Sequence, residues 1–386
     1  MLIAGEASGD LLAAELVRAL RAQLASSEPC PPKFFGAGRR QMAEAGVELT
    51  VDMTAFGVVG VSDVVKRFLP IRQAFRRLLA LAIERQPDVI IGVDYGGFNL
   101  RFASAIKRHV TAHRGAFSNW QPKLVQFVSP QVWASRAGRA WQMERDLDLL
   151  LSIFLFEKAW YAQRVPKLRV EFVGHPIFDR YPQVKARTLP SSIHHPPSSP
   201  TLLLLPGSRP GEIKRHLPVM LEALKLLRAK LPGLRAEIVL PSDELLAQAT
   251  ALGLPAEVAA CIGGLAAALS RATVALASTG TVTVECAFFG VPTVTLYKTS
   301  WSTYEIGKRV VKVKSLTMPN LLAGEKVFPE FIQSDATPEN LAQAALPLLT
   351  DDARRALVAT KLEKIVAALG GPGATQRAAQ AIAGLR

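Results

Sequence analysis

Short apolar runs recur along the chain, and most of them are separated by segments with the period of an amphipathic helix. Each run is rich in Leu, Ile or Val and is followed by a loop that contains glycine. Continuous apolar runs that alternate with helices are typical of parallel sheets covered by helices on both faces. The pattern predicts strands at 2–4, 88–94, 123–128, 148–152, 169–173, 201–205, 235–240, 272–277 and 292–297.

One break in this pattern divides the chain into two halves of similar length. Residues 188–200 are dominated by Pro, Ser and His and keep no apolar period, which predicts a linker. We therefore expect a Rossmann-like domain at 1–187 and a second one at 201–372. A terminal helix at 373–386 follows a Gly-rich hinge and could pack back on the first domain.

The composition excludes several classes of protein. With 386 residues, of which 49% are hydrophobic, the chain can bury two cores and is not intrinsically disordered. The three cysteines, Cys30, Cys261 and Cys286, form no C-x-x-C motif, which argues against a disulfide framework or a zinc knuckle and favours a reducing cytosol. The sequence shows no signal peptide, and its longest apolar run is much shorter than the roughly 20 residues of a membrane span.

The net charge of +14 indicates a phosphorylated or polyanionic partner, or an anionic membrane surface. The excess is unequal, because residues 1–190 carry +9 and residues 191–386 carry +5. No nucleic acid is expected as a partner, since no arginine-rich stripe with interleaved aromatics and no nucleic-acid-binding module can be recognised.

Ligands bind at the carboxyl ends of the strands in open α/β sheets, so the loops after the predicted strands are the candidate sites. The first of these loops contains Gly5, Glu6, Ser8 and Gly9 and leads into a helix that we expect to begin near Asp10. Free N–H groups at such a helix start suit an anion or a polar ligand edge. For this loop taken alone, a plain strand-to-helix turn with an Asp or Ser cap is the favoured interpretation.

A carboxylate, Asp94, stands at the end of the strand predicted at 88–94, and two glycines follow it closely. In that position it could serve as a general base that accepts a proton from an attacking hydroxyl. The commoner role of an Asp between strand and helix is that of a helix cap or a turn residue. The pattern alone leaves both interpretations open.

The second half contains a loop suited to a diphosphate, directly after the strand predicted at 201–205. Gly207 and Ser208 expose backbone N–H groups, and Arg209 adds a planar guanidinium that is always charged. The motif is weak evidence by itself, but its position after a strand strengthens it.

A second phosphate-binding loop is predicted where the strand at 272–277 runs into a helix. Small hydroxyl residues and glycine at a helix N-terminus favour anion binding. Glu285 follows about one helical turn later, where a carboxylate can accept hydrogen bonds from ribose hydroxyls, although a surface Glu is the simpler interpretation. The loop itself consists of Ser278, Thr279, Gly280 and Thr281.

Two phosphate-binding loops in the second half and a carboxylate in the first half match the layout of a GT-B glycosyltransferase. This α/β architecture has two Rossmann-like domains that face a cleft, with the nucleotide sugar on the C-terminal domain and the acceptor and base on the N-terminal domain. The sequence shows no His, Cys or Asp cluster with the spacing of a metal site. It therefore requires no metal or other cofactor, and Arg, Lys and helix dipoles would stabilise the leaving diphosphate.

The stretch 61–83 has the pattern of a basic amphipathic helix. For 71–83 we favour a helix that packs on the core with a solvated polar face. For 61–69, core packing and membrane docking are equally supported. The candidate membrane patch comprises Val61, Val64, Val65, Lys66, Arg67, Phe68 and Leu69.

Eight motifs spread over nearly the whole chain resemble those of the lipid-A-disaccharide synthases, a family of inverting GT-B enzymes. Together and in this order they are highly specific. They are AGEASGD at 4–10, GVDYGGFN at 92–99, VSPQVWA at 128–134, FEK at 156–158, FVGHP at 172–176, LPGSR at 205–209, STGTVTVE at 278–285 and MPNLLAG at 318–324.

The resemblance implies a reaction between UDP-2,3-diacylglucosamine and 2,3-diacylglucosamine 1-phosphate. The 6-hydroxyl of the acceptor would attack the anomeric carbon of the donor, giving a β-1,6-linked disaccharide 1-phosphate and UDP without a metal. It also implies a cytoplasmic protein peripheral to the inner face of the inner membrane, with the stretch 61–69 in membrane contact, and a tendency to form a homodimer.

The resemblance also implies roles for single residues. Asp94 matches the catalytic carboxylate, Arg209 the essential Arg, Glu285 the ribose contact and Asn320 a residue of the donor site. The family commonly has a second acid where this chain has Gly97, so Asp94 is expected to act alone. Another UDP-sugar glycosyltransferase or a UDP-sugar epimerase is the alternative, because its second half would look similar.

Overall fold

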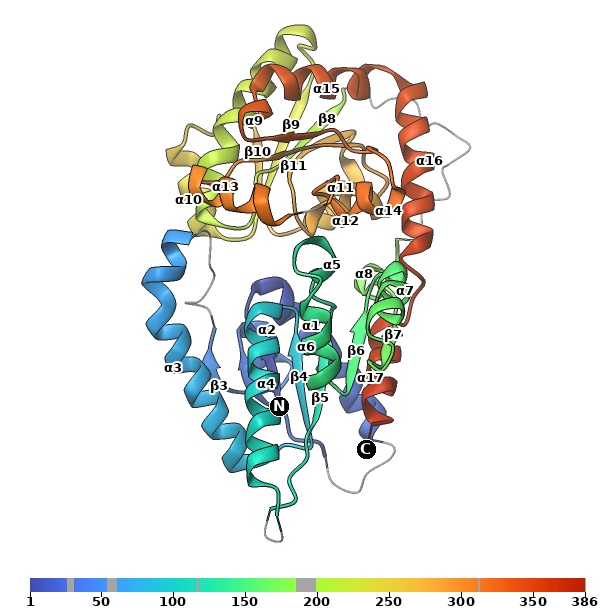
Figure 1. Ribbon diagram of the computed structural model, residues 1–386. Coiled ribbons are helices and arrows are strands. Elements are labelled where there is room, and N and C mark those ends of the chain that lie inside the picture. Colours follow the sequence, from blue (N-terminus) through green and yellow to red (C-terminus); the bar gives the residue numbers. More distant parts are fainter. Residues whose placement is uncertain (26–30, 54–60, 116–117, 185–198, 312, 386) are drawn as a thin grey trace. The chain divides into compact units, whose positions relative to one another are not determined.

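Figure 1 shows a computed structural model of the chain, which describes residues 1–25, 31–53, 61–115, 118–184, 199–311 and 313–385. The side chains of residues 61–68 and 306 lie outside this description, as does most of the linker predicted at 188–200. The chain forms two compact units. The first comprises Met1–Arg180 and Leu369–Arg386, and the second comprises Tyr181–Ala368.

The first unit contains a seven-stranded sheet in the order β3-β2-β1-β4-β5-β6-β7, and all of its strand pairs are parallel. Its strands are β1 (Leu2–Ala4), β2 (Phe35–Gly38), β3 (Glu48–Asp52), β4 (Val89–Val93), β5 (Lys123–Phe127), β6 (Leu149–Ser152) and β7 (Val170–Phe172). Its helices are α1 (Ala7–Ala25), α2 (Arg40–Glu44), α3 (Val61–Arg85), α4 (Gly96–His113), α5 (Val132–Ser135), α6 (Arg139–Asp146), α7 (Leu155–Arg164), α8 (Ile177–Arg180) and α17 (Ala374–Ala383).

Helices cover both faces of this sheet (Figure 1). On one face, Ile3 belongs to an apolar core that includes Leu78 of α3, Phe102 of α4 and Tyr161 of α7. Ala4 points to the opposite face, since successive strand residues alternate, and the first turn of α1 lies against it. Helix α1 also packs along α17, so the last helix of the chain belongs to the first unit.

The second unit contains a six-stranded parallel sheet in the order β10-β9-β8-β11-β12-β13. Its strands are β8 (Thr201–Leu205), β9 (Arg235–Leu240), β10 (Ala259–Ile262), β11 (Val274–Ser278), β12 (Thr293–Tyr297) and β13 (Glu330–Ile332). Its helices are α9 (Pro210–Lys230), α10 (Asp243–Ala251), α11 (Leu265–Arg271), α12 (Val282–Phe288), α13 (Trp301–Val310), α14 (Met318–Ala323), α15 (Pro338–Thr350) and α16 (Asp352–Ala368).

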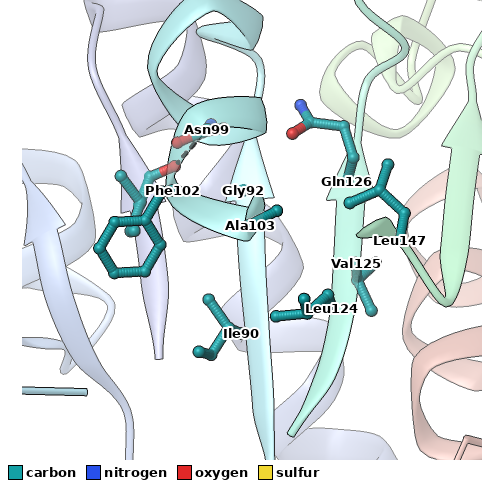
Figure 2. Close-up of a pocket in the computed structure, with 10 residues that line it drawn as sticks. Ile90, Gly92, Asn99, Phe102, Ala103, Leu124, Val125, Gln126 and Leu147 are labelled. Carbon is teal, nitrogen blue, oxygen red and sulfur yellow. Dashed lines mark hydrogen bonds between the residues drawn. The ribbon is translucent and has the colours of Figure 1, made fainter. Parts of the chain in front are cut away.

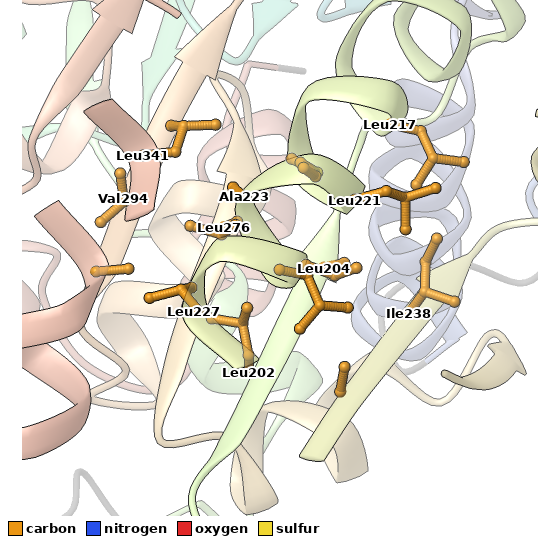
Figure 3. Packing of buried hydrophobic residues seen from close by; sticks show 14 of the residues in the cluster. Leu202, Leu204, Leu217, Leu221, Ala223, Leu227, Ile238, Leu276, Val294 and Leu341 are labelled. Atoms are coloured by element: carbon orange, nitrogen blue, oxygen red, sulfur yellow. The ribbon is translucent and has the colours of Figure 1, made fainter. Parts of the chain in front are cut away.

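A Leu-rich core fills the space between this second sheet and helices α9 and α15. Figure 3 shows Leu202 and Leu204 of β8 packed beside Leu221 of α9, with Val294 of β12 and Leu341 of α15 nearby. The run of leucines at 202–204 is buried completely, which explains why this central strand is apolar without alternation.

The fold class predicted from the pattern is confirmed, because the chain contains two Rossmann-like parallel-sheet domains. All nine predicted strands are present, but the pattern missed β2, β3, β10 and β13. Three of these four strands lie at sheet edges and are short or partly exposed. The fourth, β2, reads FGAG and has few branched residues to signal a strand. A Cβ on Gly36 would lie only 1.9 Å from the Leu2 carbonyl oxygen, so glycine is required there.

The predicted start of the first helix near Asp10 was wrong, because α1 begins at Ala7. Asp10 instead lies inside the helix, where its carboxylate is buried and caps a different element. It accepts hydrogen bonds from the backbone N–H groups of Arg39, at 2.6 Å, and Gln41, at 2.9 Å. The sequence could not reveal this role, since the cap and the helix that it serves are about 30 residues apart.

Candidate functional site

Each sheet has one topological switch point, where ligands bind in open α/β folds. In the first unit this point lies between β1 and β4, and in the second it lies between β8 and β11. The four loops at these two points are the ones that the sequence singled out. They are Gly5–Gly9 after β1, Asp94 after β4, Pro206–Arg209 after β8 and Thr279–Thr281 after β11.

Asp94 occupies the turn between β4 and α4, with its side chain partly exposed. Its backbone N–H donates a hydrogen bond of 2.9 Å to the carbonyl oxygen of Phe127 on β5. Asp94 and Tyr95 both have left-handed backbones, with φ of 51° and 41°, which is unfavourable for residues other than glycine. The N-cap of α4 is Tyr95, so Asp94 is not the helix cap that the sequence left open.

The loop after β1 lies against the same turn. A Cβ on Gly5 would lie 2.5 Å from the ring of Tyr95, and a Cβ on Gly9 would lie 3.5 Å from the Cβ of Asp94. The two glycines therefore allow the start of α1 to approach Asp94 closely. Burial, together with the nearby Glu6 carboxylate, raises the pKa of Tyr95. Glu6 and Ser8 are both partly exposed beside this turn.

A buried carboxyl group, Glu157, lies in the first turn of α7, which follows β6 in the same unit. Its two oxygens accept hydrogen bonds from the indole nitrogen of Trp133, at 3.0 Å, and from the hydroxyl of Ser152, at 2.6 Å. Burial raises the pKa of Glu157 to about 7, although these donors oppose the shift. The motifs VSPQVWA and FEK, which are far apart in sequence, thus meet at this carboxyl group.

In the second unit, Arg209 is the N-cap of α9 and donates a hydrogen bond of 3.3 Å to Glu212. The other oxygen of Glu212 accepts a hydrogen bond of 3.0 Å from the backbone N–H of Ser208. Gly207 has a φ of +128°, and a Cβ on it would lie 2.3 Å from the Glu212 carboxylate. The Ser208 N–H, which the sequence predicted to be exposed, is therefore bonded to Glu212. The loop presents the Arg209 guanidinium at the N-terminus of α9, where the helix dipole favours anions.

The side chain of His216 on α9 holds this loop by hydrogen bonds. Its Nδ1–H donates a hydrogen bond of 2.8 Å to the carbonyl oxygen of Pro206, while its Nε2 accepts a hydrogen bond of 3.0 Å from the backbone N–H of Lys298. The hydrogen bond from the Lys298 N–H fits the neutral tautomer with its proton on Nδ1, and the carbonyl oxygen of Lys298 also lies 3.2 Å from Nε2. Burial lowers the pKa of His216, which favours the same neutral form.

The loop after β11 begins at Ser278, which is the last residue of that strand and is buried. Gly280 and Thr281 are exposed, and α12 starts directly after them. Glu285, in the first turns of α12, accepts a hydrogen bond of 2.8 Å from the hydroxyl of Tyr181. The ring of Tyr181 packs edge-on against Phe289 at 5.1 Å, which holds the hydroxyl toward Glu285.

Asn320 is buried at the start of α14, and its side-chain amide serves as a hub within the second unit. Its Nδ2 donates hydrogen bonds to the Phe328 carbonyl oxygen and to Glu330, and its Oδ1 accepts two from the backbone N–H groups of Val327 and Phe328, all at 2.8 Å. Glu330 also accepts hydrogen bonds from Thr317. Asn320 thus shapes the segment 317–330.

The amphipathic stretch forms a single helix, α3. Residues Ala74, Leu78 and Ala82 are buried in the core of the first unit, as the core-packing interpretation of 71–83 predicts. Of the candidate membrane patch, residues 61–68 lie outside the described side chains, whereas Leu69 is 65% exposed. Within the described residues, no helix has the length and apolar character needed to cross a bilayer.

Several residues near these loops were missed by the sequence analysis. Tyr181 and His216 contact the candidate loops only through the tertiary fold, and Glu157 belongs to the FEK motif but was assigned no role. One feature of the sequence could have identified Glu157 and His216. An ionisable residue on the apolar face of a predicted helix needs a hydrogen-bonding partner when the helix is buried. Within the described residues, no group of three or more His, Cys, Asp or Glu side chains is arranged to hold a metal ion.

The sequence matches known proteins over its full length. Residues 1–384 match the family model described as lipid-A-disaccharide synthetase. A lipid-A-disaccharide synthase from Trichlorobacter lovleyi is 38% identical, with 98% of this chain and 95% of the relative covered. One from Coxiella burnetii is 33% identical, with 99% and 97% covered.

Solved structures with low sequence identity share the fold. A UDP-GlcNAc 2-epimerase from Neisseria meningitidis, bound to UDP-GlcNAc, has a TM-score of 0.62 at 11% identity, with 99% of each chain covered. The calicheamicin glycosyltransferase has a TM-score of 0.58 at 14% identity, with 99% of this chain and 98% of that chain covered. The two-domain architecture is therefore that of GT-B glycosyltransferases and related epimerases.

Proposed function

Since the chain belongs to the lipid-A-disaccharide synthase family, we propose that it transfers 2,3-diacylglucosamine from UDP-2,3-diacylglucosamine to 2,3-diacylglucosamine 1-phosphate. The chain is a glycosyltransferase with lipid-A-disaccharide synthase activity. The identity of both substrates and the roles of single residues are parts of the proposal. The product is a β-1,6-linked disaccharide 1-phosphate, and UDP is released.

The reaction is a single displacement with inversion at the anomeric carbon. The oxygen of the acceptor 6-hydroxyl forms a bond to the anomeric carbon of the donor as the bond from that carbon to the diphosphate oxygen breaks. Asp94 acts as the general base and takes the hydroxyl proton, and UDP leaves with the electron pair. Because Gly97 stands where the family commonly has a second acid, Asp94 carries this step alone.

Residues of the second unit bind the donor and stabilise the charge that develops on its diphosphate. Arg209 provides a guanidinium, and the N-termini of α9 and α12 provide backbone N–H groups and a favourable dipole. Glu285 accepts hydrogen bonds from the ribose hydroxyls. The remaining donor-binding residues are Gly207, Ser208, Ser278, Thr279, Gly280, Thr281 and Asn320, and Gly5, Glu6, Ser8 and Gly9 line the acceptor side.

One observation supports these assignments most directly. All four candidate loops follow the strands that flank a switch point, and in such folds these loops contact the ligand. Asp94 in addition adopts a left-handed backbone conformation, and strained residues of this kind cluster at active sites.

The decisive experiment measures UDP release from the two diacylated substrates by the purified enzyme. We expect Asp94→Asn to lower kcat by about 10²–10⁴-fold, the range typical of a lost general base, and Arg209→Ala to abolish measurable turnover. Circular dichroism and the unfolding midpoint show whether each variant is folded. Normal turnover in a folded Asp94 variant would contradict the assigned base.

The same assay distinguishes the alternative function. A different UDP-sugar glycosyltransferase or an epimerase would act on UDP-N-acetylglucosamine and leave the acylated donor unchanged. The family membership over residues 1–384 favours the acylated substrates. Association with the inner membrane through residues 61–69 and formation of a homodimer are further parts of the proposal.

A further inference from the structure

Two buried side-chain amides hold the backbone of Asp94. The Nδ2 of Asn99 on α4 and the Nε2 of Gln126 on β5 each donate a hydrogen bond of 2.9 Å to the main-chain oxygen of Asp94. Asn99 is only 4% exposed and Gln126 only 1%. We call these two side chains the amide clamp.

The amide clamp ties together the ends of three neighbouring strands. Asn99 also reaches the carbonyl oxygen of Ile3 on β1, at 3.3 Å, and that of Val93 on β4, at 3.4 Å. Gln126 also donates to the carbonyl oxygen of Val128, at 3.1 Å, directly after β5. The clamp therefore spans the switch point of the first unit, beneath the turn that carries Asp94.

The residues that the clamp holds have strained backbones. Asp94 has a φ of 51° and Val128 a φ of 67°, and a left-handed backbone is especially unfavourable for a β-branched residue such as Val. Gln126 donates to the carbonyl oxygens of both residues. Strained conformations of this kind persist only where the surrounding structure imposes them, and the clamp supplies that constraint.

The clamp is not a simple stabilising contact. The Oδ1 of Asn99 is buried and has no hydrogen-bond partner, because the amide is turned so that its nitrogen faces three carbonyl oxygens. Burying an unsatisfied acceptor costs free energy. Figure 2 shows Asn99 and Gln126 beside a small cavity of about 10 Å³, which has room for no more than one water molecule and none for a substrate.

A glycine allows the two amides to lie this close to β4. A Cβ on Gly92 would lie 2.7 Å from the Oε1 of Gln126 and 2.8 Å from the Cβ of Asn99. Both side chains appear above Gly92 in Figure 2. Gly92→Ala would therefore displace the clamp without removing either amide.

We propose that Asn99 and Gln126 are positioning residues that fix Asp94 in the geometry needed for proton transfer. This inference rests on the proposed function, in which Asp94 is the general base. The clamp acts on the main chain of Asp94 and not on the substrate, so its loss changes kcat and leaves KM and UDP affinity nearly unchanged. A displacement of about 1 Å at a reacting group can cost as much as 10²-fold in rate.

The test compares Gln126→Met and Gly92→Ala with Gln142→Met as a matched control. Gln142 is an amide of the same unit that donates hydrogen bonds to the carbonyl oxygen of Leu100, at 3.1 Å, and to the hydroxyl of Ser104, at 3.0 Å, and none to the main chain of Asp94 is found among the described residues. We expect kcat to fall by about 10- to 100-fold in both clamp variants, with KM within about twofold, and to stay normal in the control. Gln126→Met removes one amide, whereas Gly92→Ala displaces both amides without removing either. If one of the two variants fails to fold, the other still tests the inference.

A double mutant separates positioning from a general structural effect. In an Asp94→Asn background, Gln126→Met should lower the residual single-turnover rate no further, because no base remains to be positioned. A further loss equal to that in the single mutant would overturn the inference, as would normal kcat in folded clamp variants. Full activity of Asp94→Asn alone would instead overturn the proposed function.

Discussion

The indole nitrogen of Trp133 donates a hydrogen bond of 3.0 Å to the carboxyl group of Glu157, which is completely buried. This contact links the short helix α5, which follows β5, to the first turn of α7, which follows β6. Burial raises the pKa of Glu157 from 4.5 to about 7, so the folded protein holds its proton more tightly than the unfolded chain does.

A raised carboxyl pKa makes stability fall as the pH rises. Below about pH 4.5, Glu157 is protonated in both the folded and the unfolded protein, and its contribution to the free energy of unfolding is fully present. This contribution is lost as the pH rises through about 7. Glu157→Gln stays neutral, so the stability of the variant relative to the wild type should rise by up to about 3 kcal/mol between pH 4.5 and pH 8. Urea unfolding of both proteins at a series of pH values gives their free energies of unfolding. If these free energies changed with pH in the same way in both proteins, the raised pKa of Glu157 would be contradicted.

The hydrogen bond from Tyr181 to Glu285 leads to a prediction about nucleotide binding. Tyr181→Phe removes only the hydroxyl, while the ring can still pack on Phe289. We expect the Kd for UDP to rise about fivefold, since a single hydrogen bond contributes about 1 kcal/mol. Isothermal titration calorimetry measures the change, and Tyr304→Phe on α13 is the matched control. An unchanged Kd would show that Tyr181 does not orient Glu285.

In contrast to the effect of Glu157, the lowered pKa of His216 predicts that stability rises with pH. Its pKa is lowered by burial, so the contribution of His216 is present above its unfolded value near 6.5 and is lost as the pH falls below it. His216→Leu should cost about 1–3 kcal/mol of stability at pH 8, because it leaves the Pro206 carbonyl oxygen and the Lys298 N–H group unpaired. The deficit should shrink at pH 5, where the wild type must protonate the ring or unfold. A deficit that does not change with pH would contradict this account.

Leu69 provides a test of membrane binding. It is 65% exposed on α3, in the stretch proposed to contact the membrane, whereas Leu357 on α16 is 61% exposed outside that stretch. Leu69→Glu should lower co-sedimentation with phosphatidylglycerol vesicles about tenfold, because it removes one inserted apolar side chain and adds a repelled charge. Leu357→Glu should have little effect. Equal losses in both variants would point to non-specific binding.

The sequence by itself determined the architecture and the positions of the candidate loops. Apolar runs such as 202–204 and 90–91 are buried on both sides by helices. Each of these strands can therefore be predicted from its own residues, without knowledge of the strands that pair with it. Because all the strands are parallel, the loop after each strand lies at the carboxyl edge of its sheet wherever the strand pairs. The glycines and polar residues of those loops were therefore recognisable as candidate sites, and the motifs indicated the family.

Only the tertiary structure decided which side chains support these loops. Gln126 and Asp94 are 32 positions apart, and Tyr181 and Glu285 are 104 apart, so no local pattern connects them. The strands β3, β10 and β13 likewise depend on pairing at a sheet edge, since their own residues are weakly apolar or partly exposed. Hydrogen bonds from buried polar side chains are specific in distance and direction, and both are properties of the folded chain. The chemistry of each loop is local, whereas its geometry is imposed by distant residues.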